Sequence, residues 1–294
     1  MSGRFGAVLT AMLTPFDAAG ALDLDAAQQV ARWLVEQGND GLVIAGTTGE
    51  SPTLTDPERL DLIKAVAEAV TVPVVAGTGT NDTAHSVGLT RQAVGLGAAG
   101  VLIVGPYYNR PPQAGIEAHV RACAAATELP VVVYDVPGRT GKRLATDVLL
   151  RLFREVPNVV AFKDATGDLA AAAGLVHALG DGIEIYSGDD AATLPLLAVG
   201  AVGTIGVATH WCTPQTVEMV AAHTKGDVVR ARELNGSMLE SYAFGNTEES
   251  NYSMTAKAML RTLGLPAGEC RLPLPPTPPG VEDRCREVYS SLNA

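Results

Sequence analysis

The sequence is poor in cysteine and histidine, and neither residue type is spaced as in a metal or disulfide site. The four cysteines among 294 residues form no C-x-x-C pair, which predicts free thiols in a reducing compartment. The five histidines form no H-x-x-H or H-x-x-x-H group, the spacing that would place two imidazoles on one helix face. We therefore expect no metal site and a cytoplasmic protein.

The chain also lacks basic clusters and long uninterrupted apolar tracts. The net charge is −11 at pH 7 and no run of Lys and Arg is present, which argues against a nucleic-acid partner. The longest apolar tract, Leu194 to Ala208, is interrupted by one proline and three glycines, so it does not predict a membrane span. The apolar run before Thr14 is too short for a signal peptide. No membrane partner is expected.

Short apolar runs, in contrast, recur along most of the chain, and hydrophobic residues make up 47% of it. Continuous apolarity, rather than alternation, is typical of parallel strands that are covered on both faces. Eight such runs predict eight strands, at 7–13, 41–45, 72–77, 100–104, 130–134, 159–162, 183–186 and 202–207.

Helical patterns lie between these runs. Residues 25–37 place apolar side chains on one face, and Thr55 to Glu58 has the S/T-x-x-E form of a capping box. Asp82, Thr146 and Asp168 are expected to begin later helices. Strands that alternate with helices predict an α/β fold, a (β/α)₈ TIM barrel, over residues 1–225. Residues 226–294 contain helical patterns without strands, which predicts a C-terminal helical extension that packs on the barrel.

The segment Gly95 to Gly100 matches G-x-G-x-x-G, the spacing of a dinucleotide-binding loop. Such a loop must follow a strand and begin a helix, whereas this segment ends a helix and leads into a strand. We interpret it as a helix end and a tight turn. No cofactor is predicted from it.

Candidate site residues, most of them polar, lie at or after the ends of the predicted strands that meet at one face of a barrel, where barrel enzymes hold their active sites. They are Thr47 and Thr48 after strand two, Tyr107 and Tyr108 after strand four, Tyr134 and Arg139 around the end of strand five, Lys163 at the end of strand six, Gly188 with Asp189 and Asp190 after strand seven, and Ile205 with Gly206 on strand eight. The two aspartates are expected to shape a loop or cap a helix, without a chemical role.

Lys163 is unusual because it follows four apolar residues at the end of a predicted interior strand. A free lysine has a pKa near 10.4, so only about one in a few thousand is neutral at pH 7, but desolvation lowers that value. A neutral amine can attack a ketone and form a Schiff base. Lys163 could instead extend to solvent or pair with Asp164 or Glu50. The nearby tyrosines and threonines favour the Schiff base, since they can transfer protons without carrying charge.

Four motifs, taken together, resemble the family of class I aldolases typified by dihydrodipicolinate synthase and N-acetylneuraminate lyase. They are GTTGE at 46–50, YYNRP at 107–111, YDVPGRT at 134–140 and FKDATG at 162–167, in the order and at the spacing of that family. The resemblance covers essentially the whole chain.

The resemblance implies a role for each candidate residue. Lys163 would form the Schiff base with pyruvate, and Tyr134, Thr47 and Tyr108 would form a proton relay, with Tyr108 reaching in from a neighbouring subunit. Thr47 and Thr48 would hold the carboxylate of pyruvate, and Arg139 would bind the carboxylate of a second substrate. The other expected substrate-binding residues are Gly188, Ile205 and Asn251.

The implied reaction condenses pyruvate with L-aspartate-4-semialdehyde to 4-hydroxy-tetrahydrodipicolinate, in lysine and diaminopimelate biosynthesis, in a homotetramer built as a dimer of dimers. The family pattern N-P-x-P-x-K is here Asn251 to Lys257 without its prolines, and a strand-eight serine is Gly206. Lysine-inhibited members tend to carry His or Glu at the positions of Asp56, Arg59 and His85, and inhibition by lysine is not predicted.

Three other functions remain open at this stage. A pyruvate-dependent sugar-acid aldolase or dehydratase would use the same imine, although Arg139 favours a carboxylate-bearing acceptor over a polyhydroxylated one. An inactive barrel that binds a keto acid would leave Lys163 with its ordinary titration. A pyridoxal-phosphate enzyme also uses a lysine, but no glycine-rich phosphate loop follows the late strands.

Overall fold

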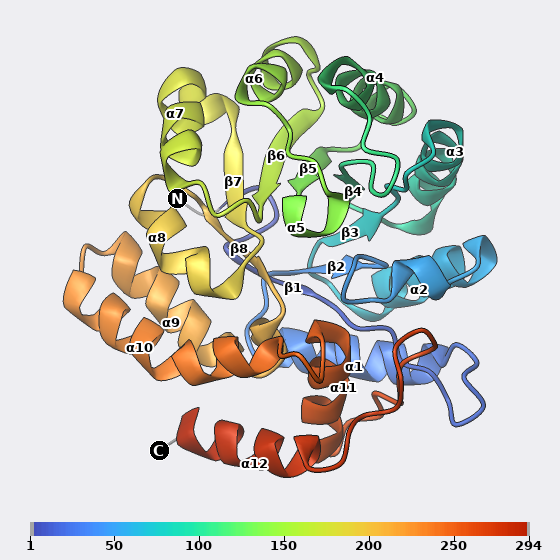
Figure 1. Ribbon diagram of the computed structural model, residues 1–294, viewed down its shortest axis with the longest axis vertical. Coiled ribbons are helices and arrows are strands. Elements are labelled where there is room, and N and C mark those ends of the chain that lie inside the picture. The colour runs from blue at the N-terminus through green and yellow to red at the C-terminus, as the bar shows by residue number, and fades with distance from the viewer. Residues whose placement is uncertain (1–2, 293–294) are drawn as a thin grey trace.

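The computed structural model describes residues 3–292, and its centre is a closed barrel of parallel strands (Figure 1). Each strand pairs with the next along the chain, and the eighth pairs with the first. This confirms the predicted (β/α)₈ fold. The strands are β1 Val8–Ala11, β2 Gly41–Ile44, β3 Val74–Gly77, β4 Gly100–Val104, β5 Val131–Asp135, β6 Val159–Asp164, β7 Glu184–Ser187 and β8 Gly203–Gly206.

Helices surround the barrel and continue beyond it (Figure 1). The outer ring consists of α1 Leu24–Glu36, α2 Asp56–Ala69, α3 Thr83–Ala93, α4 Gln113–Ala124, α6 Thr146–Glu155, α7 Leu169–Leu179, α8 Thr193–Ala198 and α9 Thr213–Thr224. The single-turn helix α5, Pro137–Thr140, lies between β5 and α6. The C-terminal helices are α10 Val228–Gly245, α11 Tyr252–Thr262 and α12 Val281–Leu292. Short 3₁₀ turns are η1 Ser51–Thr53, η2 Val94–Leu96, η3 Gly180–Gly182, η4 Asp190–Ala192 and η5 Ala208–His210.

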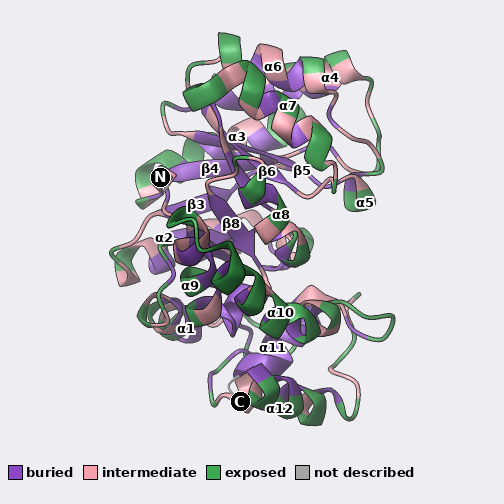
Figure 2. Cartoon of the chain, turned by 90° about the vertical axis from the view of Figure 1, so that its left-hand side faces the viewer, coloured by how far each residue is buried: buried purple, intermediate pink, exposed green. Residues whose placement is uncertain are grey.

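The strands are apolar on both faces because each face is buried in a different cluster (Figure 2). Inside the barrel, Leu9, Val43, Val75 and Val132 pack together with other inward-facing side chains. Outward-facing residues of the same strands pack against the helix ring. Burial on both sides stabilises a parallel sheet and explains the continuous apolar runs in the sequence.

Most of the predicted helix starts are confirmed. The side chains of Asp82 and Asp168 accept backbone N–H groups at the starts of α3 and α7, and Thr55 with Glu58 forms both bonds of a capping box. Helix α6 differs, because Thr146 is its first residue and Ala145 at the cap makes no side-chain bond. Gly97, at φ +84°, ends η2 just before β4, which confirms a turn rather than a dinucleotide loop.

The C-terminal segment is linked to the loop that follows β2. Glu50 in that loop is buried and adopts a left-handed conformation, with φ +53°. Its Oε1 lies 2.6 Å from Nζ of Lys257 on α11, and its Oε2 accepts the backbone N–H of Arg271 at 2.9 Å. Both cations also lie over the ring of Phe16. Helix α10 packs on α9, and the division at residue 225 stays a prediction.

The four cysteines are free thiols, as predicted. Among residues 3–292, no helix combines the length and apolarity needed to cross a bilayer. In the same range no group of three His, Cys, Asp or Glu side chains is placed to hold a metal ion.

Candidate active site

Two adjoining cavities lie at the end of the barrel where the strands finish. The larger measures about 320 Å³ and the smaller about 130 Å³. Thr47, Tyr134, Val136 and Arg139 line both, so the cavities are neighbouring parts of one site. The site therefore includes residues that the sequence had placed at this face of the barrel.

Lys163 lies within β6 and is 5% exposed. It lines the smaller cavity, and its Nζ is 4.4 Å from the centre of the Tyr134 ring on the neighbouring strand. Burial lowers the pKa of Lys163 to about 8, Asp190 partly opposes this, and the positive charge of Arg139 adds to it. A substantial neutral fraction near neutral pH makes this amine a candidate nucleophile.

Neither carboxylate considered as a partner for Lys163 pairs with it. Asp164 accepts the backbone N–H of Thr166 at 2.8 Å, and Glu50 contacts Lys257 instead. Within the described chain, no ion pair is recorded for the Lys163 amine. The pairing interpretation is therefore wrong, and the amine is left to face the cavity.

Gly188 provides space for the aliphatic part of Lys163. A Cβ atom at Gly188 would lie 3.1 Å from both Cγ and Cε of the lysine, tighter than ordinary van der Waals contact. Gly188 also lines the smaller cavity. The sequence predicted this glycine as a substrate-binding residue, and the structure places it directly beside the lysine chain.

Tyr134 and Thr47 lie together beside the amine. Burial raises the pKa of Tyr134 to about 12, and a side-chain hydrogen bond with Thr47 is among the interactions that oppose this rise. The phenol is therefore neutral at pH 7 and can both donate and accept a hydrogen bond. A neutral hydroxyl next to a reactive amine is suited to proton transfer.

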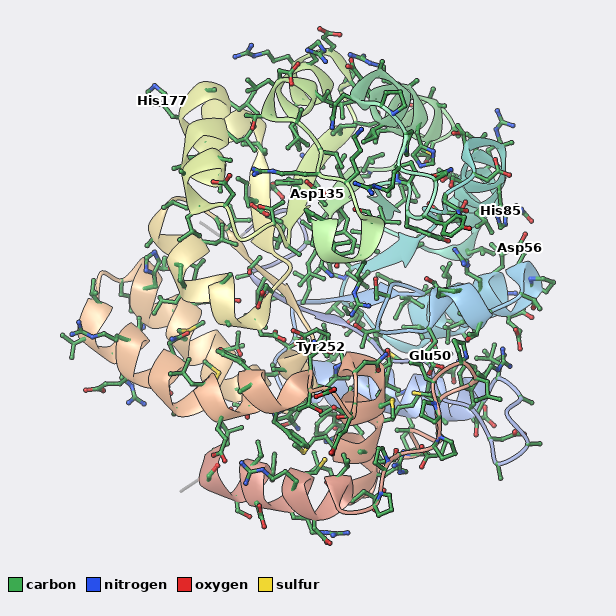
Figure 3. All side chains as sticks on the ribbon, viewed as in Figure 1. Glu50, Asp56, His85, Asp135, His177 and Tyr252 are labelled. Carbon is green, nitrogen blue, oxygen red and sulfur yellow. The ribbon has the colours of Figure 1, made fainter. Side chains whose placement is uncertain are left out.

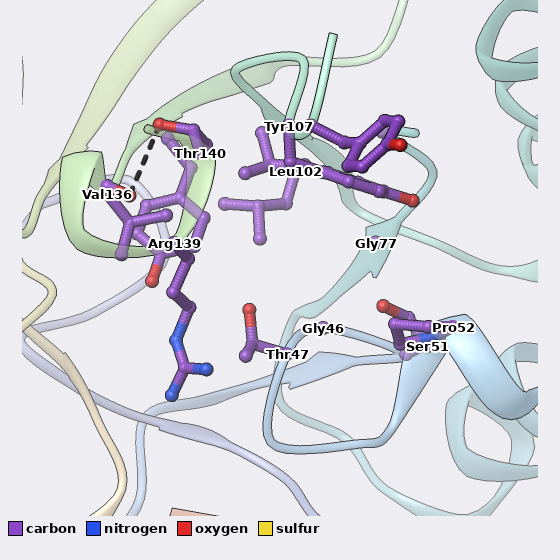
Figure 4. A pocket seen from close by; sticks show the side chains of 15 residues that line it. Gly46, Thr47, Ser51, Pro52, Gly77, Leu102, Tyr107, Val136, Arg139 and Thr140 are labelled. Carbon is purple, nitrogen blue, oxygen red and sulfur yellow. Dashed lines mark hydrogen bonds between the residues drawn. The ribbon is translucent and has the colours of Figure 1, made fainter. Parts of the chain in front are cut away.

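Arg139 is positioned by the single-turn helix α5. Pro137 begins the turn, and Gly141, at φ +70°, ends it by donating its N–H to the Pro137 carbonyl. The Arg139 side chain extends toward Thr47 on the wall of the larger cavity (Figure 4). No hydrogen bond or ion pair to another residue in 3–292 is recorded for its guanidinium. The guanidinium group of Arg139 is thus available to bind a carboxylate with two parallel hydrogen bonds.

Thr48 and Tyr108 complete the candidates that contact the cavities. Thr48 is buried and lines the smaller cavity. Tyr108 lines the larger one but is 89% exposed, and its backbone is left-handed, with φ +69°. An aromatic side chain this exposed can reach across to another molecule.

Ile205 and Asn251 are not among the residues that line either cavity. Ile205 is fully buried inside the barrel. The Asn251 side chain caps α11 by accepting the N–H groups of Ser253 and Met254, both at 3.1 Å. Their role in substrate binding stays a prediction.

Asp190 and Tyr252 are among the lining residues that were not predicted to contact a substrate. Asp190 accepts the backbone N–H groups of Val207 and Ala208, so it shapes the loop after β8 as expected, and burial raises its pKa to about 6. Tyr252 begins α11 and also lines the smaller cavity (Figure 3). In the sequence, Tyr252 was notable only because it stands where the family pattern has a proline, and this does not indicate where its ring lies.

Comparison with known proteins gives consistent matches. Residues 4–290 match the model of the dihydrodipicolinate synthetase family. The chain is 52% identical to 4-hydroxy-tetrahydrodipicolinate synthase 2 of Streptomyces coelicolor, over 92% of this chain and 89% of that one. It resembles the dihydrodipicolinate synthase of Cyanidioschyzon merolae with lysine bound, at TM-score 0.95 and 38% identity over 98% of each chain. It also resembles the chloride-inhibited Acinetobacter baumannii synthase complexed with pyruvate, at TM-score 0.93 and 34% identity over 99% of each chain.

Proposed function

Since this chain belongs to the dihydrodipicolinate synthetase family, we propose that it condenses pyruvate with L-aspartate-4-semialdehyde to give 4-hydroxy-tetrahydrodipicolinate. This is a lyase-type reaction of lysine and diaminopimelate biosynthesis that proceeds through a Schiff base. The observation that carries the proposal is the buried amine of Lys163, with its lowered pKa, beside Tyr134 and within the same cavity as the unpaired guanidinium of Arg139.

The reaction begins with attack of the neutral Lys163 amine on the ketone carbon of pyruvate. The resulting carbinolamine loses water and becomes an imine, and the protonated imine withdraws electrons from the adjacent methyl carbon. Loss of a proton from that carbon gives an enamine, whose carbon then forms a bond to the aldehyde carbon of the second substrate. Hydrolysis or internal attack by the amino group of the product releases the lysine.

Each proton transfer in this sequence requires a group near Lys163 that holds a proton without adding charge. Tyr134, with its neutral phenol, and Thr47, which bonds to it, are the groups best placed. The exposed Tyr108 would serve as the third member of the relay in a partner subunit. The hydroxyl groups of Thr47 and Thr48 would bind the pyruvate carboxylate in the smaller cavity, with Gly188 leaving room for the imine.

Arg139 is proposed to bind the carboxylate of the semialdehyde. We expect Arg139→Ala to raise KM for the semialdehyde about 10- to 100-fold, because charge-assisted hydrogen bonds are lost, and to change KM for pyruvate much less. Steady-state kinetics with each substrate varied in turn measures both constants. An unchanged KM for the semialdehyde would count against this acceptor. Faster cleavage of a keto-sugar acid than condensation by the unaltered protein would favour a sugar-acid aldolase.

The assembly and location follow from the same premise. We infer the homotetramer from the family, and the exposed Tyr108 is accessible to a neighbouring subunit, as a shared relay would require. The free thiols are consistent with the cytoplasmic location predicted from the sequence. The proposed Schiff-base chemistry uses the Lys163 amine and neighbouring hydroxyl groups, and it requires no cofactor.

The lowered pKa of Lys163 predicts how imine formation depends on pH. At pH 7 about a tenth of an amine with a pKa near 8 is neutral, compared with about one in a few thousand for a free lysine. The rate of adduct formation with pyruvate should therefore rise with pH up to about 8 and then level off. Borohydride trapping over a series of pH values measures this rate. A rate that still rises steeply at pH 10 would show an ordinary lysine.

A further inference from the structure

Tyr252 lines the smaller cavity, but the proposed reaction assigns it no role. It is the first residue of α11, where Asn251 fixes the start of the helix by capping it. Its ring packs over Gly245 at the end of α10, since a Cβ there would lie 3.3 Å from Cε1 of the tyrosine. This packing directs Tyr252 from the C-terminal extension into the smaller cavity, which also contains Lys163 and Arg139.

The hydroxyl group of Tyr252 has no recorded hydrogen bond to another residue between 3 and 292, and it is not sealed from the cavity. Tyr252 is half-buried, so its hydroxyl is available to a ligand that enters the cavity. The charged groups that act on it are Asp189 and Asp190, which raise its pKa, and Arg139, which lowers it. Burial and the two carboxylates raise the pKa of Tyr252, so its phenol is a neutral hydrogen-bond donor at neutral pH.

We infer that Tyr252 is a specificity-determining residue, whose hydroxyl group binds the polar, carboxylate-bearing end of the acceptor aldehyde beside Arg139. The inference rests on the proposed function, because it needs a second substrate in this cavity. A phenol donates one directed hydrogen bond, so it complements the guanidinium group of Arg139. Because it is neutral, it adds no charge that would shift the pKa of Lys163. The ligand class is a short aldehyde with a carboxylate a few bonds from the carbonyl group.

This geometry separates the two halves of the reaction. Lys163 reacts with pyruvate at the inner part of the cavity, on β6, whereas Tyr252 enters from α11 with Arg139 on α5. Loss of the Tyr252 hydroxyl should therefore affect the acceptor and not the imine. A purely structural role for the tyrosine would depend on its ring, which packs on Gly245, and would not depend on the hydroxyl.

The test compares Tyr252→Phe with Tyr242→Phe. Tyr242 lies on α10, its hydroxyl donates to the sulfur of Met238, and it does not line the smaller cavity, so this variant removes a phenol hydroxyl outside that cavity. For each variant we would measure KM for pyruvate, KM for L-aspartate-4-semialdehyde, borohydride trapping with pyruvate alone, and turnover with propanal, an aldehyde that lacks a carboxylate. Thermal unfolding provides the check on folding.

We expect Tyr252→Phe to raise KM for the semialdehyde about tenfold, which corresponds to one hydrogen bond to a charged group. Pyruvate trapping, KM for pyruvate and turnover with propanal should stay at the level of the unaltered protein, as should every constant of Tyr242→Phe. An unchanged KM for the semialdehyde, or the same rise in Tyr242→Phe, would overturn the inference. If the unaltered protein traps pyruvate but condenses it with no carboxylated aldehyde, the proposed function fails first, and the inference fails with it.

Discussion

Lys163→Ala is expected to lose turnover by about 10⁴-fold or more, because the covalent route disappears when the amine that lines the cavity is removed. The variant should remain folded. Burial disfavours the charged form of Lys163, and no ion pair is recorded for it in the described chain, so its replacement breaks no network. The measurement is steady-state condensation together with borohydride reduction in the presence of pyruvate.

In the unaltered protein, reduction should attach pyruvate to the peptide that contains Lys163, and mass spectrometry of the digest identifies that peptide. Lys64→Ala is a suitable control, since Lys64 is an exposed residue of α2 far from both cavities. It should keep full activity and full labelling. Labelling that persists in Lys163→Ala at another lysine, with turnover intact, would refute the Schiff base that we assign to this residue.

Tyr134→Phe is expected to lower kcat by about 10²- to 10⁴-fold, the usual contribution of a positioned proton-transfer group. The ring that lies 4.4 Å from the lysine amine would be kept, so only the hydroxyl and its bond to Thr47 would be lost. Binding of pyruvate should change little by comparison. Pre-steady-state trapping with pyruvate and steady-state turnover together separate slow chemistry from weak binding.

The matched control for Tyr134 is Tyr186 on β7, the neighbour of Lys163 on its other side. The Tyr186 hydroxyl donates to the Gly6 carbonyl at 3.1 Å and lies outside both cavities. Tyr186→Phe should therefore reduce stability by about 1 kcal/mol and leave kcat within a few fold. Equal losses of kcat in the two variants would show that a general change of packing, and not proton transfer by Tyr134, is responsible.

The sequence predicts the barrel well because each strand is buried on two faces. Burial on both faces requires a continuous apolar run, and each of the eight predicted runs overlaps one strand of the structure. Boundaries are less certain from sequence. Lys163 was expected at the end of a strand, but β6 continues through Asp164, since backbone pairing with β5 and β7 extends to that residue regardless of side-chain polarity.

The site could be predicted mainly where its residues lie on strands or in the loops that follow them. Lys163, Tyr134 and Thr47 follow directly from strand positions, and a barrel brings strand ends together. The structural position of Tyr252 could not be inferred in this way. It depends on how α10 and α11 pack onto the barrel, and in particular on the absence of a side chain at Gly245. Such packing between distant segments leaves no periodic signal in the sequence.

The contact between Glu50 and the C-terminal segment has a consequence for how the chain matures during its synthesis. All eight strands are complete at Gly206, but Lys257 and Arg271, which pair with the Glu50 carboxylate, lie later in the chain, Arg271 by 221 residues. Until those residues leave the ribosome, the Thr47–Thr48 segment stands next to a carboxylate without its partners, in a strained left-handed backbone. A nascent or truncated chain could thus form all eight strands before the Thr47–Thr48 loop is held in place. We therefore expect catalytic activity only after the C-terminal residues that pair with Glu50 have been translated.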